Sequence, residues 1–140
     1  MSAEENKAKQ RRVWEEVFNK GNLEIIPELF APNYEFHTPL ALEAKGPEGF
    51  KQMSTMLHTA LPDLHCTIDD MFAEEDKVAC RVTLTGTYKG ELMGMPPTGN
   101  KVSIEAFLIT HWADGKEVEA WDSLDTLSFY QQLGVPIPSQ

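Results

Sequence analysis

The spacing of hydrophobic residues changes once along the chain, near His65. Before His65, apolar residues recur at intervals of three and four, which is the period of an amphipathic helix. This pattern predicts three helices, within residues 2–21, 22–30 and 46–62. A short strand is expected between the second and the third, at residues 33–38. From His65 onward the period is two, which predicts four strands within residues 65–76, 77–88, 101–112 and 115–125.

Cap residues support these boundaries and add a last helix. Ser2 and Glu5 have the spacing of a capping box at the start of the first helix. Asp125 suits the N-cap of a helix that ends at Gly134. Helices first and antiparallel strands later indicate an α+β fold, with the helices packed on one face of the sheet. With 140 residues, the chain fits a single domain spanning residues 1–140.

The strand at residues 115–125 contains an acidic residue in an apolar row. Val118, Ala120, Asp122 and Leu124 alternate along it and therefore point to the same face. An ionised carboxyl group costs free energy there unless it has a partner, is protonated or has a function. Burial raises the pKa of a carboxyl group, and such a group can take a proton from a substrate and return it. The alternative is a structural role, in which Asp122 caps a backbone group or pairs with a cation.

The turn before this strand sets the partners of Asp122. A three-residue loop with Gly115 in the left-handed conformation pairs Trp112 with Lys116, and it brings Ala106 opposite Asp122. In that register Ala106, Leu108 and Thr110 share the face of Asp122. A two-residue loop would place His111 beside that row instead. The Asp-Gly dipeptide is compatible with both loops, and we expect the first.

Arg81 is the nearest candidate partner for Asp122. Arg81 and Thr83 lie in one row of the strand at residues 77–88. If this row lines the interior, Arg81 could hold Asp122 ionised or orient a substrate carbonyl. If the row faces water, Arg81 is a surface residue. The pattern does not decide between the two.

The opposite face of the last two strands is also apolar. Phe107, Ile109 and Trp121 lie on it and would form a large exposed patch unless they are covered. The simplest cover is a second copy of the chain, packed sheet against sheet. We therefore expect a homodimer, with further packing within the chain as the alternative.

Charge and composition exclude several classes of function. The formal net charge is −10, which makes nucleic acid and anionic membranes unsuitable partners. Residues 1–12 precede no apolar run, and no segment is long enough to span a membrane, so a cytoplasmic protein is expected. Cys66 and Cys80 lack a CxxC spacing and are expected to be free thiols. The histidines lack metal-ligand spacing, and no metal site is expected.

Two long segments carry a family resemblance. GTYKGELMGMPPTGNKV (86–102) and DGKEVEAWDSLDTLSFYQQLG (114–134) resemble the SnoaL-like polyketide cyclase family, which belongs to the nuclear-transport-factor-like superfamily. The segments VFNKGNLEIIPELFAPNYEFHTP (17–39) and GPEGFKQ (46–52) also fit, so the resemblance covers nearly the whole chain. It implies a single SnoaL-like domain: a cone-shaped, curved antiparallel or mixed sheet wrapped around the N-terminal helices, with a deep pocket. It also implies a dimer.

The resemblance implies a role for Asp122. In the family's cyclases a carboxylate at this place removes a proton flanked by carbonyl groups, and an intramolecular aldol addition then closes a ring. The implied ligand is a small apolar or polyketide-like molecule, and no cofactor or metal is needed. Those cyclases tend to have His or Gln facing the aspartate, whereas Ala106 and Leu108 are expected here. Hydrogen-bond donors are therefore sought in Arg81, Thr110 and His37.

These considerations give two groups of candidate residues. The catalytic candidates are Asp122, Arg81 and His37. The alternative for a lone histidine such as His37 is a packed or surface residue without a catalytic role. The candidate substrate-binding residues are Ala106, Leu108, Thr110, Thr83 and Met95.

Two other functions stay open at this point. Limonene-epoxide-hydrolase-like enzymes of the same superfamily use an Asp-Arg-Asp set, two members of which resemble Asp122 and Arg81. The second acid is expected two residues beyond Arg81, and Thr83 stands there. The other possibility is a pocket that binds a small apolar molecule without catalysis.

Overall fold

The computed structural model of the protein describes residues 2–39 and 44–136. Helix α1 (Ala3–Arg12) begins at the predicted capping box: the Glu5 N–H donates to Ser2 Oγ, and the Ser2 N–H donates to the Glu5 carboxylate. The chain continues into a wider π-helical segment, η1 (Val13–Asn19). The remaining helices before the long strands are η2 (Leu23–Ile25), α2 (Ile26–Leu29) and α3 (Gly46–Ala60). The three helical regions predicted from the sequence are confirmed.

One mixed sheet of six strands forms in the described residues. The strands are β1 (Phe30–His37), β2 (Ala44–Lys45), β3 (His65–Glu74), β4 (Lys77–Thr87), β5 (Lys101–Ala113) and β6 (Lys116–Leu124). Their order is β2-β1-β6-β5-β4-β3, and all neighbours are antiparallel except β1 and β6, which are parallel. Helix α4 (Thr126–Leu133) follows, with its N-cap at Asp125 and its end at Gly134 as predicted.

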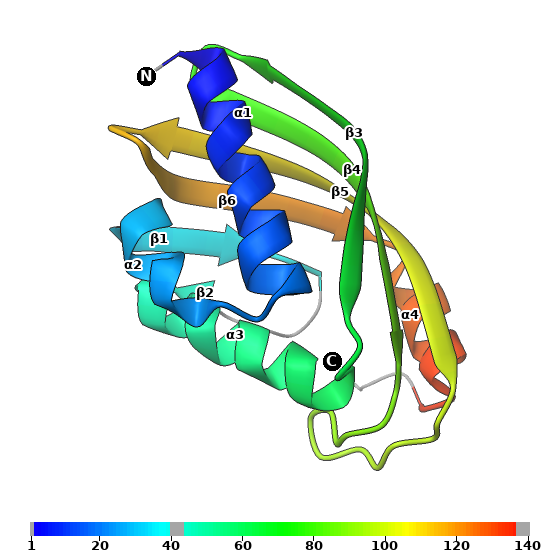
Figure 1. Cartoon of the computed structure of the whole chain (residues 1–140). Helices are drawn as coiled ribbons and strands as arrows, with labels where there is room; N and C mark the ends of the chain where they lie inside the picture. The colour runs from blue at the N-terminus through cyan, green and yellow to red at the C-terminus, as the bar shows by residue number, and fades with distance from the viewer. Residues whose placement is uncertain (1, 40–43, 137–140) are drawn as a thin grey trace.

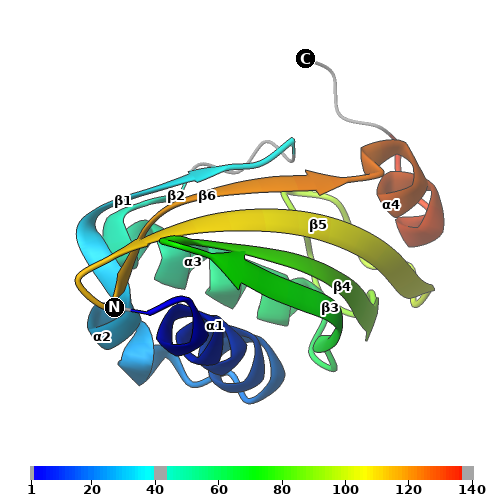
Figure 2. The same cartoon turned by 90° about the horizontal axis from the view of Figure 1, so that it is seen from above.

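The sheet curves around the helices and gives the molecule an inner and an outer face. Helices α1, α2 and α3 all lie against the inner face, and α4 lies at the end of β6 (Figures 1 and 2). The buried apolar side chains of the helices and of the inner face form one core. This arrangement confirms the expected α+β fold with helices on one side of a curved sheet.

The β5–β6 hairpin differs from the expected register. Asp114 and Gly115 have φ values of 52° and 78°, and they form a two-residue turn between Ala113 and Lys116. Two consecutive residues with positive φ are typical of a type I′ turn, whose twist matches that of the strands. Asp122 therefore lies opposite Leu108, and the expected pairing with Ala106 is wrong.

A β-bulge in β6 compensates for the shorter turn. Glu117 pairs with Trp112 and Glu119 pairs with His111, so Val118 has no partner in the ladder. A two-residue turn alone would move Asp122 to the outer face, because a shift of one residue exchanges the two faces of a strand. The extra residue reverses that exchange and returns Asp122 to the inner face. It also places Glu117 inside, where the sequence alternation predicts Val118.

The outer face carries a group of exposed apolar side chains, which we call the outer patch. Its members are Phe72, Phe107, Ile109 and Trp121. The prediction that the last two strands are apolar on both faces is confirmed. Phe107 is 53% exposed, which is unusual for a large apolar residue inside a long strand.

Two expectations from composition can be compared with the structure. Cys66 and Cys80 are free and buried, as expected. None of the helices in residues 2–39 and 44–136 combines the length and the apolar character that a membrane-spanning helix requires.

Candidate active site

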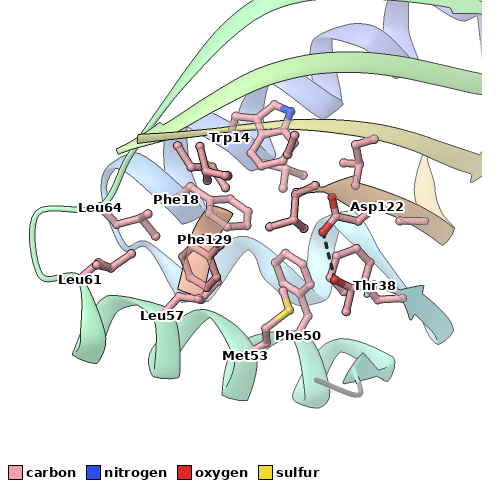
Figure 3. A pocket seen from close by; sticks show the side chains of 18 of the residues that line it. Trp14, Phe18, Thr38, Phe50, Met53, Leu57, Leu61, Leu64, Asp122 and Phe129 are labelled. Atoms are coloured by element: carbon pink, nitrogen blue, oxygen red, sulfur yellow. Dashed lines mark hydrogen bonds between the residues drawn. The ribbon is translucent and has the colours of Figure 1, made fainter. Parts of the chain in front are cut away.

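A pocket lies between the inner face of the sheet and the helices. Its empty space is about 940 Å³, including the part that opens to solvent. Most lining side chains are apolar, and they come from α1, η1, α3, α4 and the inner rows of the strands (Figure 3). A mostly apolar lining with a few polar groups is typical of a site for a small organic ligand.

Asp122 is the acidic group at one side of this pocket. Figure 3 shows its side chain among apolar residues, with the Thr38 hydroxyl group at its carboxyl group. Thr38 Oγ1 donates a hydrogen bond of 3.1 Å to Asp122 Oδ2. Burial raises the pKa of Asp122 to about 6, and the hydrogen bond from Thr38 opposes part of this rise. Near neutral pH, Asp122 is thus ionised but more basic than an aspartate in water.

The parallel pairing of β1 and β6 brings Thr38 to Asp122. His37 lies opposite Trp121 in the ladder, so the next residue along each strand is Thr38 and Asp122. The two side chains point inward because His37 and Trp121 point outward. Thr38 was missed from the sequence because a threonine at the end of a short strand gives no sign of the distant residue that it will contact.

Glu117 is a second carboxyl group of the pocket. It is 2% exposed and lines the pocket together with Asp122, which lies five residues further along β6. Burial raises the pKa of Glu117 to about 8, and a hydrogen bond with the Tyr34 hydroxyl group opposes this rise. The pKa of Tyr34 is raised well above its usual value by burial, and then by its neighbours Glu117 and Asp122. Glu117 is therefore neutral at pH 7, whereas Asp122 is charged.

Of the predicted substrate-binding residues, Ala106 and Leu108 line the pocket. Thr110 lies on the inner face but is completely buried, and its hydroxyl group accepts a 2.8 Å hydrogen bond from Trp112 Nε1. Met95 lies in the β4–β5 loop, where its carbonyl oxygen accepts a hydrogen bond from the Tyr88 hydroxyl group. Neither Thr110 nor Met95 is among the lining residues of the pocket.

Arg81 and Thr83 point to the outer face. Arg81 forms ion pairs with Glu105 at 3.2 Å and with Asp69 at 3.9 Å. Thr83 Oγ1 donates to Asp69 Oδ2. The row of β4 that lines the interior is the other one, which includes Val82 and Leu84. This placement does not fit the hypothesis that Arg81 contacts Asp122 inside the pocket. It also does not fit Thr83 as a residue that binds substrate there.

His37 also points away from the pocket. Its Nε2 lies 2.6 Å from Glu119 Oε2 and 3.9 Å from Glu35 Oε2, and its ring stacks on Trp121. The ligand atoms of Glu35, His37 and Glu119 lie within 4.8 Å of one another, so these three side chains could hold a metal ion. They belong to the outer face, on the opposite side of the sheet from Asp122. This placement does not fit the predicted catalytic role of His37 beside Asp122.

Comparison with known proteins supplies an independent observation. Residues 8–133 match the family of SnoaL-like polyketide cyclases. Aklanonic acid methyl ester cyclase DauD from Streptomyces sp. (strain C5) is 32% identical over 130 residues, which cover 89% of this chain and 79% of that protein. Nogalonic acid methyl ester cyclase from Streptomyces nogalater is 29% identical over 127 residues, which cover 87% of this chain and 92% of that protein. The solved structure of TsrD from Streptomyces laurentii has a TM-score of 0.85 at 26% identity, covering 97% of this chain and 99% of its own.

The raised pKa of Glu117 predicts a specific dependence of stability on pH. Below its usual value of 4.5, Glu117 is protonated in both the folded and the unfolded chain. Between 4.5 and about 8 only the folded chain keeps the proton, so the free energy of unfolding falls as the pH rises through this window. Each unit of pKa shift corresponds to about 1.4 kcal/mol, so the loss attributable to Glu117 is a few kcal/mol.

Glu117→Gln removes the ionisable group, so the variant should lose less stability than the wild type between pH 5 and pH 8. Urea unfolding of both proteins at the two pH values measures the difference. Equal losses in the two proteins would show that Glu117 does not hold a proton in the folded state at pH 7. Because each protein is compared with itself, any general destabilisation by the substitution cancels.

Proposed function

The chain belongs to the SnoaL-like polyketide cyclase family, and we propose that it catalyses an intramolecular aldol-type ring closure with Asp122 as the base and acid. The observation that carries this proposal is the position of Asp122 in an apolar pocket, held by Thr38 and with a pKa of about 6. A carboxylate of this basicity is ionised near neutral pH and still accepts a proton effectively. Acid/base chemistry of this kind needs no cofactor.

The reaction can be written with Asp122 alone. The carboxylate takes a proton from a carbon that lies between two carbonyl groups, and the substrate's own conjugation delocalises the resulting negative charge. The carbanion then attacks a ketone of the same molecule, so that a carbon–carbon bond forms and the ketone oxygen becomes an alkoxide. Protonated Asp122 returns its proton to the alkoxide and is ready for another cycle.

The pocket favours a neutral substrate. Asp122 and Glu117 are its two carboxyl groups, and no Lys, Arg or His is among the described residues that line it. A free carboxylate would lose its hydration beside an ionised Asp122 without gaining a cation, whereas a methyl ester carries no charge. We therefore propose a polyketide ester as the substrate class, in keeping with the methyl esters named for the two cyclase relatives.

The hydrolase alternative has less support. Limonene-epoxide-hydrolase-like chemistry needs an arginine beside the aspartate, whereas Arg81 pairs with Glu105 and Asp69 on the outer face. The other alternative, binding without catalysis, predicts a wild type that binds the ester and does not convert it.

Asp122→Asn should lower the rate of ring closure by about 10²–10⁴-fold, because an amide cannot accept the substrate proton. Turnover of aklanonic acid methyl ester and nogalonic acid methyl ester can be followed by liquid chromatography with mass detection, and binding by calorimetry. Retained affinity with lost turnover supports catalysis by Asp122. Ser123→Ala, on the outer face of the same strand, is the matched control and should turn over at the wild-type rate. Full activity of Asp122→Asn would remove Asp122 from the mechanism, and binding without turnover by the wild type would favour a ligand-binding protein.

The pH dependence of kcat/KM tests the protonation state of Asp122. The base is active when ionised, so kcat/KM should rise with pH through a midpoint near 6. Thr38→Val removes a hydrogen bond that lowers the pKa of Asp122, so the midpoint should move to higher pH. Thr59→Val alters an exposed threonine of α3 in the same way and should leave the midpoint in place. A wild-type profile that is flat between pH 5 and pH 7 would contradict the assignment.

We also propose that a second copy of the chain covers the outer patch. The patch lies on a sheet face, and a two-fold axis through it would bring the same apolar side chains of both copies together. Its apolar residues are accompanied by the paired charges of Arg81 and Glu105, which suits the polar rim of an interface.

Phe107→Glu should convert this dimer to a monomer, because it buries an unpaired charge in the interface. Leu127→Glu is the matched control: Leu127 is 51% exposed on α4, against 53% for Phe107, and the dimer should persist. Sedimentation velocity of the three proteins measures the outcome. A monomeric wild type, or equal effects of the two substitutions, would contradict a dimer through this face.

A further inference from the structure

Helix α1 and the segment that follows it carry a row of buried polar side chains. Asn6, Gln10 and Trp14 are spaced by four residues, so they lie on one side of the helix, and they are 1%, 1% and 5% exposed. Asn6 Oδ1, Gln10 Oε1 and Trp14 Nε1 have no hydrogen-bond partner within the described part of the chain. The Trp14 N–H lies beside the Cys80 sulfur, which is a weak acceptor.

Glu117 of β6 is a further buried polar residue of the same pocket. Its Oε1 is likewise buried and unpartnered among the residues described, while Tyr34 shares a hydrogen bond with the carboxyl group. Gln10 and Glu117 both line the pocket. We call these two residues and the pocket surface between them the α1–β6 wall.

Buried oxygens without a partner are rare in folded proteins, because each costs about 1–3 kcal/mol relative to a hydrogen-bonded one. Two of them, on Gln10 and Glu117, line the pocket, and a third, on Asn6, lies one helical turn before Gln10. One proton on Glu117 cannot satisfy all three. The surplus of acceptors at a pocket wall is the feature expected where a ligand supplies a donor.

We propose that the α1–β6 wall binds a hydroxyl group of the ligand, with Gln10 and Glu117 as its hydrogen-bond partners. A hydroxyl group donates one hydrogen bond and accepts another, so it matches an amide oxygen and a neutral carboxyl group that line the same pocket. A charged group does not suit the wall, because the described lining residues include no cation and the neutral carboxyl group offers no charge to pair with. An aromatic ring system with a phenolic hydroxyl group meets both requirements, because its rings fit the apolar lining.

The wall would orient the substrate of the proposed reaction. Asp122 and Glu117 lie on the same strand and line the same pocket, so one ligand can reach both carboxyl groups. The hydroxyl group at the α1–β6 wall fixes one end of a planar ring system, and the acidic carbon then lies toward Asp122. This orientation rests on the proposed function, whereas the recognition of a hydroxyl group does not.

Calorimetric titration with two simple probes, 1-naphthol and naphthalene, tests the inference without any turnover. The quantity measured is the hydroxyl preference, defined as the dissociation constant of naphthalene divided by that of 1-naphthol. The wild type should show a preference of about 3- to 30-fold, which corresponds to one or two buried hydrogen bonds. A wild-type preference of one or less overturns the inference.

Gln10→Met and Glu117→Met keep the length of the side chain and remove its hydrogen-bonding groups. The preference should fall to about one in at least one of them, because the hydroxyl group then enters an apolar site. Glu117→Gln retains an acceptor and should keep the preference. If one Met variant does not fold, as judged by circular dichroism, the other decides. An unchanged preference in the variants that fold overturns the inference.

Two further variants separate this inference from the proposed function. Phe129→Leu changes an apolar residue of the pocket and should weaken the binding of both probes equally, leaving their ratio unchanged. Asp122→Asn should keep the preference. A preference lost in Asp122→Asn but kept in both Met variants would place the hydroxyl group at Asp122 and overturn the inference. Because the probes undergo no ring closure, failure of Asp122 as the base leaves these binding results unaffected.

Discussion

The loss of hydration that two carboxyl groups of β6 undergo inside an apolar pocket determines the chemistry of the site. Asp122 and Glu117 lie on the same inner face, and for both of them burial is the largest cause of a raised pKa. The core around the pocket is built from aromatic and aliphatic side chains, which offer no charge to offset this cost. Each carboxyl group therefore depends on the one or two polar neighbours that the fold places beside it.

Those neighbours give the two groups different protonation states. Thr38 donates to the partly buried Asp122, whose pKa is about 6, so Asp122 is ionised at pH 7. Glu117 is more deeply buried, and its pKa of about 8 keeps it neutral even though Tyr34 stabilises the charged form. Two carboxyl groups with pKa values on opposite sides of neutrality can serve as a base and as a hydrogen-bond donor in one pocket. The environment, not the residue type, makes this distinction.

Periodicity in the sequence predicted the elements and the inward face of Asp122, but not the details on which the site depends. The helices, the four long strands and the cap at Asp125 follow from local patterns and are confirmed, whereas the two-residue strand β2 was not predicted. The predicted register of the last hairpin differs from the observed one by two residues, because the two-residue turn and the bulge at Val118 each shift the pairing by one. The two shifts have opposite effects on the face of Asp122, so its inward direction was still predicted. Because of the same bulge, strict alternation places Val118 on the inner face and does not predict that Glu117 lies there. Gln10 was missed because a single polar residue on a helix carries no signal of burial.

The positions of Arg81 and His37 could not be derived from sequence, because each lies in a polar row, with Thr83 and Glu35, and such a row can line a pocket or face water. The structure turns both side chains outward, where acidic partners satisfy them: Glu105 and Asp69 for Arg81, and Glu119 for His37. This placement matters for Asp122. A guanidinium group inside the pocket would stabilise the ionised carboxyl group and lower its pKa, which would leave a weaker base. Keeping its cations outside the pocket allows the protein to retain a carboxylate of raised basicity, which the proposed reaction requires.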